Sequence, residues 1–485
     1  MTINDDEFAR AFMAFLTHMS NRDSAGSAGT QLGGVVGEHL GADPQTVEMV
    51  RVQYPAHRMA DLDVALEHLV GQHGGRWVGI QAGNAEHADQ FLDLLTGRLG
   101  PADTGPVAYT RTPVGPAVSR RVVRVGILLT HAAGTPLALL VRGANPHYGR
   151  PEATVEMLGD PDAAGTLQQQ IDELMNEHSV LRGQVLSFRG DDYGAPGGVV
   201  TFLARPRVSA EQVILPDGVR ERVIRHVVDI GRQSDAIRAA GQHLKRGVLL
   251  YGPPGTGKTH LVRHVLSLSP GTTAVLLTGR TLHLLAEAAN LARAMQPAII
   301  VMEDCDLVAE ERGFHSDASL FETLEAMDGL SGDADVTFLL TTNRPDLLER
   351  ALVERPGRVD LAVAIDRPDL DARVRLLRLY AASLIAAGRL SEAAIQQAAQ
   401  ATEGVTASFT RELVRRCVVT AAVEGRPVGD ADLAAELEHL LSDQQALTRS
   451  ILGGAQPDED RSGGFEGPRP GLAPRGTFGY FGPLP

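Results

Sequence analysis

Lysine is nearly absent from this chain of 485 residues. It occurs only as Lys245 and Lys258, so arginine supplies the other 43 of the 45 basic residues (45 minus 2). Cysteine is as rare, since Cys305 and Cys417 are the two thiols and no C-x-x-C pair occurs. Two such residues cannot by themselves form a zinc site. We expect both to be small buried side chains in a reducing compartment, the cytoplasm.

Positive charge is also in short supply. The 60 acidic residues exceed the 45 basic ones, giving a formal net charge of −15, and no run of basic residues occurs. This charge argues against nonspecific binding to nucleic acid or to an anionic membrane, because both need a basic surface. No apolar stretch approaches the roughly 20 residues of a membrane span. The N-terminus is acidic and lacks a signal region. We therefore expect neither a membrane span nor a nucleic-acid partner.

One of the two lysines stands in a glycine-rich segment. The segment follows an apolar run at 247–251 and precedes a helical pattern at 260–268. In this context glycines let backbone N–H groups close on phosphate oxygens. A flexible ammonium then reaches the β/γ-phosphates, where a planar guanidinium fits poorly, and the next hydroxyl binds Mg²⁺. The residues predicted to bind ATP are Gly252, Pro253, Pro254, Gly255, Thr256, Gly257, Lys258, Thr259 and His260, with Thr259 also on Mg²⁺.

Another apolar run, at 298–302, ends in two carboxylates, Glu303 and Asp304. Acidic residues at the carboxyl end of a strand lie where open α/β sheets hold a metal ion and an attacking water. The pair is therefore predicted to belong to the same site as the glycine-rich segment.

The order of elements predicts the fold class. Short apolar runs alternate with helical stretches from 211 to 367, which indicates an α/β fold with a doubly wound parallel sheet. Residues 368–452 are expected to be a helical lid. The strands of the parallel sheet are expected at 247–251, 273–278, 298–302, 336–341 and 361–365.

The region before this sheet is predicted to be a separate domain. Residues 45–210 mix helical and β-like stretches, with strands expected at 122–130, 137–141 and 199–203, which indicates an α/β or α+β domain. It contains no catalytic constellation, and we assign it to a substrate or partner. Residues 1–44 are predicted to be a helix and a flexible linker, and 453–485 a disordered tail rich in glycine and proline.

Each terminal segment has two interpretations. The first predicted helix has an apolar stripe and either packs on its own subunit or docks elsewhere through the linker. Four of the last 30 residues are aromatic, so the tail is either inert or a docking segment for a partner. The stripe consists of Phe8, Phe12, Phe15 and Met19.

A series of motifs surrounds and follows the two candidate segments. They are the loop at 252–259, the acidic strand end, Met327-Asp328-Gly329-Leu330, Thr341-Thr342-Asn343-Arg344-Pro345, Arg355-Pro356-Gly357-Arg358 and Thr402-Glu403-Gly404. With these motifs in this order, residues 216–452 resemble the AAA family of ATPases. The resemblance implies that Asn343 orients the attacking water and that Ser408 lies near the nucleotide. It also implies that Arg355 and Arg358 reach a neighbouring subunit's γ-phosphate, which requires a homo-oligomeric ring, expected to be a hexamer.

Two departures from the family pattern matter. The acidic pair reads Glu-Asp where the family has Asp-Glu, so the resemblance places Glu303 on Mg²⁺ and makes Asp304 the general base. The aromatic-apolar-glycine pore loop is missing, and the leucines at this place either line a pore or pack as a helix face. With these features the ATPase module looks closest to the branch containing the mitochondrial Rieske-protein translocase, while the N-terminal half is not matched. The leucines are Leu282, Leu284 and Leu285.

These observations predict an ATP-hydrolysing ring that remodels, chaperones or translocates a protein substrate held by the N-terminal domain. Two alternatives remain open. One is an unfoldase that feeds a protease, and the other is an assembly switch that hydrolyses ATP slowly because Asp304 is one methylene shorter than glutamate.

Overall fold

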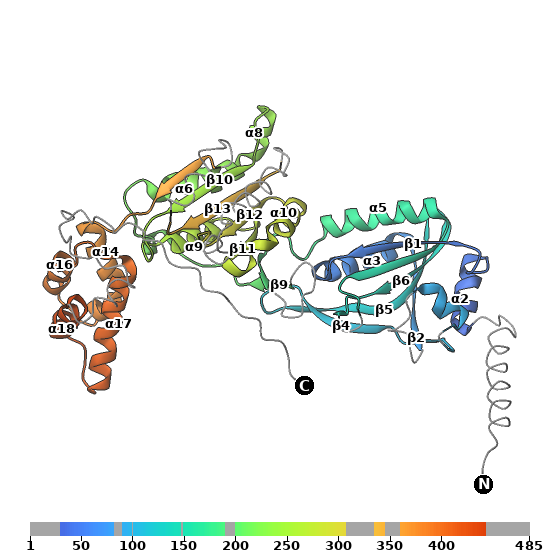
Figure 1. Cartoon of the computed structure of the whole chain (residues 1–485), viewed down its shortest axis with the longest axis horizontal. Coiled ribbons are helices and arrows are strands. Elements are labelled where there is room, and N and C mark those ends of the chain that lie inside the picture. The colour runs from blue at the N-terminus through green and yellow to red at the C-terminus, as the bar shows by residue number, and fades with distance from the viewer. Residues whose placement is uncertain are drawn as a thin grey trace, which may run out of the picture.

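The computed structural model describes residues 30–81, 90–98, 100–146, 149–189, 199–306, 334–344 and 359–442. Figure 1 shows three units along the chain: an antiparallel sheet with its helices, a parallel sheet with its helices, and a group of helices. The predicted N-terminal helix and the predicted tail lie outside the described residues. The prediction of a flexible linker is wrong for its described end, because residues 31–40 form the helix α2, whose Leu32 and Val36 are buried against the first sheet. None of the described helices is long and apolar enough to cross a bilayer.

The first unit is a seven-stranded antiparallel sheet. Its order is β1-β7-β6-β5-β2-β3, and β4 pairs with β5. Ala133 and Gly134 connect β5 to β6 with φ of 50° and 86°, the positive values that a two-residue hairpin turn of type I′ requires. The strands are β1 (Glu48–Tyr54), β2 (Arg76–Gln81), β3 (Asp103–Gly105), β4 (Ala108–Pro113), β5 (Ser119–Ala132), β6 (Thr135–Arg142) and β7 (Ala153–Gly159).

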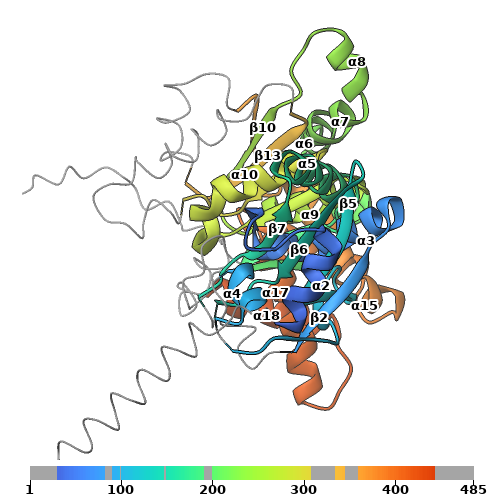
Figure 2. The same cartoon turned by 90° about the vertical axis from the view of Figure 1, so that its right-hand side faces the viewer.

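Helices lie on both faces of this sheet (Figure 2), so its central strands β6 and β7 are buried on both sides. Along β6, Leu139 and Val141 pack with α3 (Met59–His73) and α5 (Pro161–Glu177). Their neighbours Ala138 and Leu140 point to the other face, where α2 (Gln31–Leu40) and α4 (Phe91–Thr96) lie. This alternation follows from the two-residue period of a strand. A short 3-10 turn, η1 (Ala56–Arg58), leads into α3.

The second unit contains the predicted parallel sheet. Five strands run in parallel in the order β14-β10-β13-β12-β11, and each lies within one residue of its predicted range. The predicted fold class is confirmed. The strands are β10 (Arg246–Tyr251), β11 (Thr273–Leu277), β12 (Ala298–Met302), β13 (Val336–Thr342) and β14 (Leu361–Ala364).

Helices sandwich the parallel sheet as well. One face packs against α6 (Val219–Ile224), the π-helix η4 (Arg225–Asp229) and α9 (Lys258–Leu268). The other face packs against η5 (Gly279–Leu284) and α10 (Leu285–Ala294). Beyond η4, the chain forms the short helices α7 (Ile230–Arg232) and α8 (Ser234–Ala239) before it enters β10.

Two strands from the predicted N-terminal domain extend the parallel sheet. β8 (Val185–Arg189) pairs in parallel with β11, and β9 (Val199–Leu203) pairs with β8 in antiparallel fashion. Both lie in the range 45–210 that we predicted as one N-terminal domain, yet they complete the second sheet. The sequence pattern of a strand does not say which sheet it joins. Another 3-10 turn, η3 (Ala210–Gln212), follows β9.

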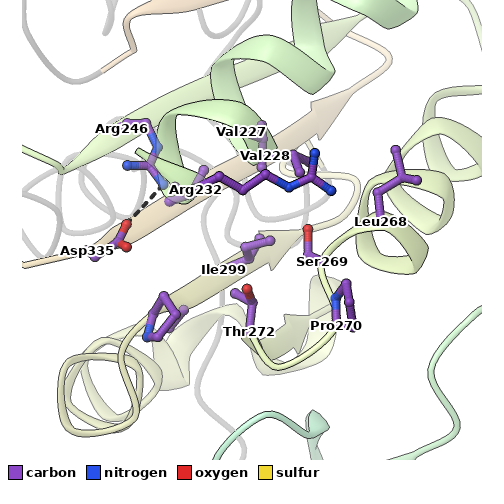
Figure 3. Close-up of a pocket in the computed structure, with 14 residues that line it drawn as sticks. Val227, Val228, Arg232, Arg246, Leu268, Ser269, Pro270, Thr272, Ile299 and Asp335 are labelled. Atoms are coloured by element: carbon purple, nitrogen blue, oxygen red, sulfur yellow. Dashed lines mark hydrogen bonds and ion pairs between the residues drawn. The ribbon is translucent and has the colours of Figure 1, made fainter. Parts of the chain in front are cut away.

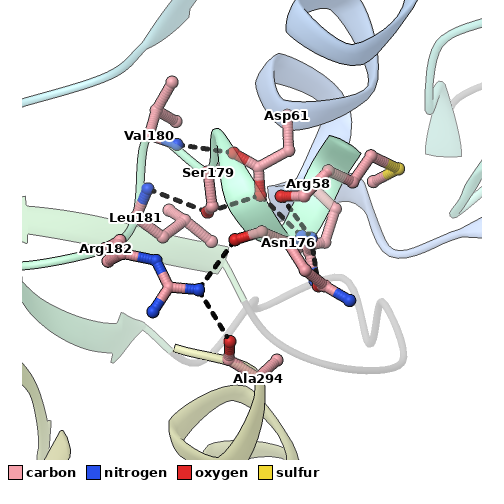
Figure 4. A network of polar contacts seen from close by, with 9 residues as sticks. Arg58, Asp61, Asn176, Ser179, Val180, Leu181, Arg182 and Ala294 are labelled. Atoms are coloured by element: carbon pink, nitrogen blue, oxygen red, sulfur yellow. Dashed lines mark hydrogen bonds and ion pairs between the residues drawn. The ribbon is translucent and has the colours of Figure 1, made fainter. Parts of the chain in front are cut away.

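A polar network fixes the joint between the two sheet units (Figure 4). Asp61 of α3 accepts hydrogen bonds from Ser179 Oγ and from the Val180 backbone N–H, both at 2.8 Å. Arg182 donates to the carbonyl oxygens of Gln296 at 2.5 Å and Ala294 at 3.3 Å, at the end of α10. The link between α5 and β8 is therefore bound to α3 of the first unit through Asp61 and to the end of α10 in the second unit through Arg182.

The third unit is helical, as predicted for the range that follows the sheet. Its core contains Phe409 and Leu413 of α17 with Leu377 of α14 and Leu437 of α18. Asp369 caps α14 by accepting a hydrogen bond from the Ala372 N–H at 2.8 Å. The helices are α14 (Leu370–Tyr380), α15 (Ala382–Ala386), α16 (Glu392–Ala401), α17 (Ala407–Val423) and α18 (Asp430–Leu441).

One arginine binds several loops at the amino-terminal edge of the parallel sheet. The Arg205 guanidinium donates to four carbonyl oxygens at 2.6–3.0 Å, from the end of α9, the start of β11 and the residues before β8. No other described side chain joins these three segments by so many hydrogen bonds. The acceptors are Leu266, Ser269, Gly183 and Thr272.

We expect Arg205→Met to lower the free energy of unfolding by about 2–4 kcal/mol, because four carbonyls lose a charged donor. Arg207→Met is the matched control, since Arg207 is exposed and two residues away. Urea denaturation followed by circular dichroism measures both. Equal urea midpoints for the two variants would show that the Arg205 hydrogen bonds do not stabilise the sheet.

Candidate active site

The glycine-rich segment forms the turn between β10 and α9. Gly252, Gly255 and Gly257 have φ of 144°, 76° and 113°, values that favour glycine. A Cβ atom on Gly252 would lie 2.3 Å from the carbonyl oxygen of Ile365. The backbone at this place is therefore compatible only with glycine, and the turn ends at the N-terminus of α9, where backbone N–H groups favour an anion.

Lys258 is the first residue of α9 and is only 6% exposed. Its Nζ donates hydrogen bonds to the carbonyl oxygens of Gly252 at 2.7 Å and Pro253 at 2.8 Å, so the ammonium lies over the turn. Burial lowers the pKa of Lys258 to about 8, against the opposing effect of the Asp304 and Asp306 carboxylates. The Lys258 ammonium therefore lies where it would contact a phosphate bound at this turn. The negative charge of that phosphate would stabilise the protonated form of the lysine.

Thr259 and Glu303 come together from α9 and the end of β12. The Thr259 hydroxyl lies near the Glu303 carboxylate. Burial raises the pKa of Glu303, and the nearby Asp304 charge adds to this effect, while the Thr259 hydroxyl lowers this pKa. A hydroxyl and a carboxylate in contact, next to a phosphate turn, form a hard-oxygen donor set that fits Mg²⁺.

Asp304 lies beside Asn343, as the roles predicted for these two residues require. The Asn343 Nδ2 atom donates to Asp304 Oδ1 at 3.2 Å. Asp304 has φ of 51°, in the left-handed region that residues other than glycine rarely adopt, and its N–H donates to Thr341 Oγ1 at 3.0 Å. Backbone strain of this kind costs about 1–3 kcal/mol and clusters at functional sites.

Asp306 is a residue that sequence reasoning missed. Its buried Oδ1 accepts hydrogen bonds from Thr342 Oγ1 at 3.0 Å and from the backbone N–H of Asn343 at 3.2 Å. It therefore holds the end of β13 in the position that brings Asn343 to Asp304. Its place two residues after Asp304, in the turn after β12, was the only available signal.

Ser408 was predicted to lie near the nucleotide, and it contacts the glycine-rich turn. Its N–H donates to the Gly255 carbonyl at 3.1 Å, and its Oγ atom lies 3.4 Å from the same oxygen. A Cβ atom on Gly255 would lie 2.7 Å from Ser408 Oγ, so glycine permits this approach of α17. The third unit thus contacts the phosphate turn directly.

An apolar cluster lies between the segment before α6 and helix α14. Ile214, Ala372 and Leu376 are buried in it, with Tyr380 and Ala407 packed against them. Ala407 precedes Ser408, so the cluster lies beside the turn. Sequence reasoning missed it, because its members are far apart in the chain.

Other predicted positions have different outcomes. The His260 ring is within 3.0 Å of the Gln212 carbonyl oxygen and so is engaged by η3. The three leucines after β11 are buried against the sheet, which confirms the packing interpretation rather than a pore lining. Arg355 and Arg358 lie outside the described residues. Among the described residues, no group of three or more His, Cys, Asp or Glu side chains could hold a metal ion.

The residues of the parallel sheet match a known protein family. Residues 248–367 match the model of the ATPase family associated with various cellular activities (AAA). The chain is 31% identical over 345 residues to the ATP-dependent zinc metalloprotease FtsH 1 of Symbiobacterium thermophilum, covering 66% of this chain and 55% of that protein. The protein of the same name from Thermomicrobium roseum is 28% identical over 294 residues (57% and 44%). The chloroplastic FTSH 5 of Arabidopsis thaliana, also named an ATP-dependent zinc metalloprotease, is 30% identical over 235 residues (45% and 33%).

The similarity is partial on both sides. The chain spans about half the length of the first curated relatives it matches, 55% and 44%. In the 485 residues no histidine is followed by glutamate, so they contain no H-E-x-x-H zinc motif. The relatives point to FtsH-like modules, and the resemblance to the branch of the Rieske-protein translocase stays a prediction.

The affinity for ATP is expected to fall as the pH rises above about 8, where Lys258 loses its proton. Below that pH the ammonium is present in the free protein. Above it, binding must take up a proton, so the Kd should rise about tenfold per pH unit. Nucleotide titrations between pH 7 and about 9.5 measure this, with Lys258→Met as control, whose weaker affinity should not depend on pH in this range. A flat profile in the unaltered chain contradicts the expectation.

Asp306→Ala is expected to lower kcat about tenfold, with little change in the Kd of ATP, because Asn343 loses its anchor. Asp306→Asn keeps an oxygen acceptor and should restore part of the rate. Steady-state ATPase assays with separate kcat and Kd values test this. Parallel losses of affinity and rate in both variants would instead indicate a general structural defect.

Proposed function

Residues 248–367 carry an AAA ATPase domain, and we propose that the chain hydrolyses ATP as a homo-oligomeric ring that remodels, chaperones or translocates a protein substrate. The contact between Asn343 and Asp304 is the observation that carries the proposal. It lies at the same edge of the sheet as Lys258 and the pair Thr259–Glu303. A phosphate turn, a hard-oxygen pair and a carboxylate with an amide partner are the parts that phosphoryl transfer to water requires.

In the proposed mechanism the turn at 252–257 binds phosphate oxygens through backbone N–H groups, and Lys258 reaches the β/γ-phosphates. Thr259 and Glu303 would hold Mg²⁺, which neutralises phosphate charge when bound. The Asp304 carboxylate accepts the proton of the attacking water, and the Asn343 amide orients that water. The Asp304 side chain is fixed for this task by the same amide.

The proposal of a ring depends on Arg355 and Arg358. We propose that these arginines reach the γ-phosphate in a neighbouring subunit. Arginines in this role contribute about 10³–10⁵ in rate. A hexamer is the ring that the family resemblance favours. Ser408 contacts the glycine-rich turn, and the apolar cluster around Leu376 packs beside it. We propose that hydrolysis moves the third unit relative to the sheet.

The substrate is proposed to be a protein that binds the N-terminal sheet. The relatives are named ATP-dependent proteases, which favours the second candidate, an unfoldase that supplies a protease. A slow switch remains the third, favoured by the short Asp304 side chain. We also propose the cytoplasm as the compartment, because both cysteines are free and buried thiols, and a partner for the aromatic tail.

Asp304→Asn is expected to lower kcat by about 10²–10⁴ without weakening ATP binding, because the base is lost while the phosphate turn is intact. Glu303→Gln is the matched variant, and it should mainly raise the Mg²⁺ concentration needed for binding. ATP turnover and nucleotide titrations at several Mg²⁺ concentrations separate the two effects. Parental turnover in Asp304→Asn, with loss in Glu303→Gln, would reverse the two assignments.

The Asp304→Asn chain also tests the proposed assembly and substrate. With ATP it should form a stable ring in sedimentation experiments and retain protein substrates that the unaltered chain releases. If the Asp304→Asn chain binds ATP but stays monomeric at every protein concentration, the ring is excluded.

A further inference from the structure

The backbone of Asp304 has an unusual conformation for its place in the fold. Among the described residues only Ala133 and Asp304 have positive φ without being glycine. Ala133 owes its value to the hairpin turn between β5 and β6, which requires positive φ. Asp304 lies instead directly after the segment in which β12 ends. A residue with a side chain stays in the left-handed region only where its surroundings hold it there.

Thr341 of β13 supplies the contacts that hold this segment. Its Oγ1 atom accepts a hydrogen bond from the Asp304 N–H at 3.0 Å. Its carbonyl oxygen accepts a second one from the N–H of Cys305, also at 3.0 Å. The N–H of Glu303 points to the other neighbouring strand and donates to the carbonyl of Leu277 in β11. Thr341 therefore binds two successive N–H groups where the chain leaves β12.

The contact with Asp304 depends on the hydroxyl of Thr341. In a regular parallel ladder, a backbone N–H is accepted by a carbonyl oxygen of the neighbouring strand. The Asp304 N–H is accepted by a side chain instead, so a residue without a side-chain oxygen at this position would remove its acceptor. Thr341 is 1% exposed, so water has little access to replace the lost oxygen.

The backbone conformation of Asp304 determines where its carboxylate lies. Asn343 Nδ2 donates to Asp304 Oδ1 at 3.2 Å, and Asn343 follows Thr341 by two residues. An aspartate carries its carboxylate on a single methylene, so φ and ψ set the direction of the Cα–Cβ bond and thereby move the carboxylate almost directly. A hydroxyl that fixes the backbone of Asp304 therefore also fixes the contact of its carboxylate with the Asn343 amide.

We propose that Thr341 is a positioning residue for ATP hydrolysis, whose hydroxyl holds Asp304 in the left-handed conformation that brings its carboxylate to Asn343. This role rests on the proposed function, in which Asp304 is the base for the attacking water. Thr341 acts through Asp304 and takes no part in the proton transfer. A purely structural role is the simpler alternative, and it would lower stability without a selective effect on kcat.

Thr337 provides a matched control on the same strand. It is buried, and its Oγ1 has no hydrogen-bond partner among the described residues. It precedes Thr341 by four residues, on the same face of β13 and roughly 13 Å away. Thr337 lines a cavity at the amino-terminal end of the strand, which the ion pair of Arg246 with Asp335 also lines (Figure 3). Thr337→Val thus removes a buried hydroxyl without touching Asp304.

Steady-state ATPase assays and nucleotide titrations of the full chain test the role of Thr341. We expect Thr341→Val to lower kcat at least about tenfold, while the Kd of ATP changes less than about twofold because the phosphate turn is intact. Thr341→Ser keeps the oxygen and should restore kcat to within about threefold of the unaltered chain. Thr337→Val should leave both values unchanged.

A double-mutant cycle shows whether Thr341 acts through Asp304. In the Asp304→Asn chain, Thr341→Val should lower the residual turnover of radiolabelled ATP by less than about twofold, since no base is left to be positioned. Equal losses in both backgrounds overturn the proposal, as does a loss that Thr341→Ser does not restore.

The proposed function and the role of Thr341 fail in different ways. Parental turnover in Asp304→Asn would remove the proposed base, and the role of Thr341 with it. Loss of turnover in Asp304→Asn, with parental kcat in Thr341→Val, overturns the role of Thr341 alone.

Urea unfolding followed by circular dichroism separates positioning from a folding defect. If Thr341→Val does not fold, Thr341→Ala is measured against Thr337→Ala. Loss of folding in both Thr341 variants, or parallel losses of ATP affinity and kcat, would show that Thr341 is purely structural and would overturn the proposal.

Discussion

The parallel pairing of β12 with β13 is the constraint on which the candidate active site depends. In this register Met302 is opposite Leu340, so Glu303 and Asp304 emerge beside Thr341, Thr342 and Asn343. Cys305 then donates its N–H to the Thr341 carbonyl at 3.0 Å, and Asp306 accepts from Thr342 and Asn343. A shift of one residue would turn these side chains to the other face of the sheet. The buried β12 and β13 side chains therefore also determine the geometry of the candidate base.

Sequence reasoning predicted the parallel sheet well, because its strands are short apolar runs with strong local signals. Gly252, Gly255 and Gly257 were likewise predicted to form a loop between a strand and a helix, and in the structure they do so with positive φ. The prediction of Lys258 in a phosphate turn rested on the same local logic. The structure adds its pKa of about 8, which depends on burial and on carboxylates about 46–48 residues away in the chain.

The remaining features depend on contacts that a single sequence does not encode locally. Of the strands β8 and β9, only β9 was predicted, and only the pairing of β8 with β11 shows which sheet the two strands join. In the sequence Asp306 is one acidic residue among many. Only the structure shows that its Oδ1 accepts a hydrogen bond from the backbone N–H of Asn343. In each case the missing information is which distant residues share a buried volume.

The two outer units are attached to the parallel sheet in different ways, and this difference bears on motion. The N-terminal sheet is joined through β8, which pairs with β11, and through Arg182, which binds carbonyls at the end of α10. The helical unit reaches the phosphate turn through Ser408 and a small apolar cluster. Strand pairing resists displacement more than a single backbone hydrogen bond does. A change at the phosphates should therefore move the helical unit first, while the N-terminal sheet follows the parallel sheet as one body.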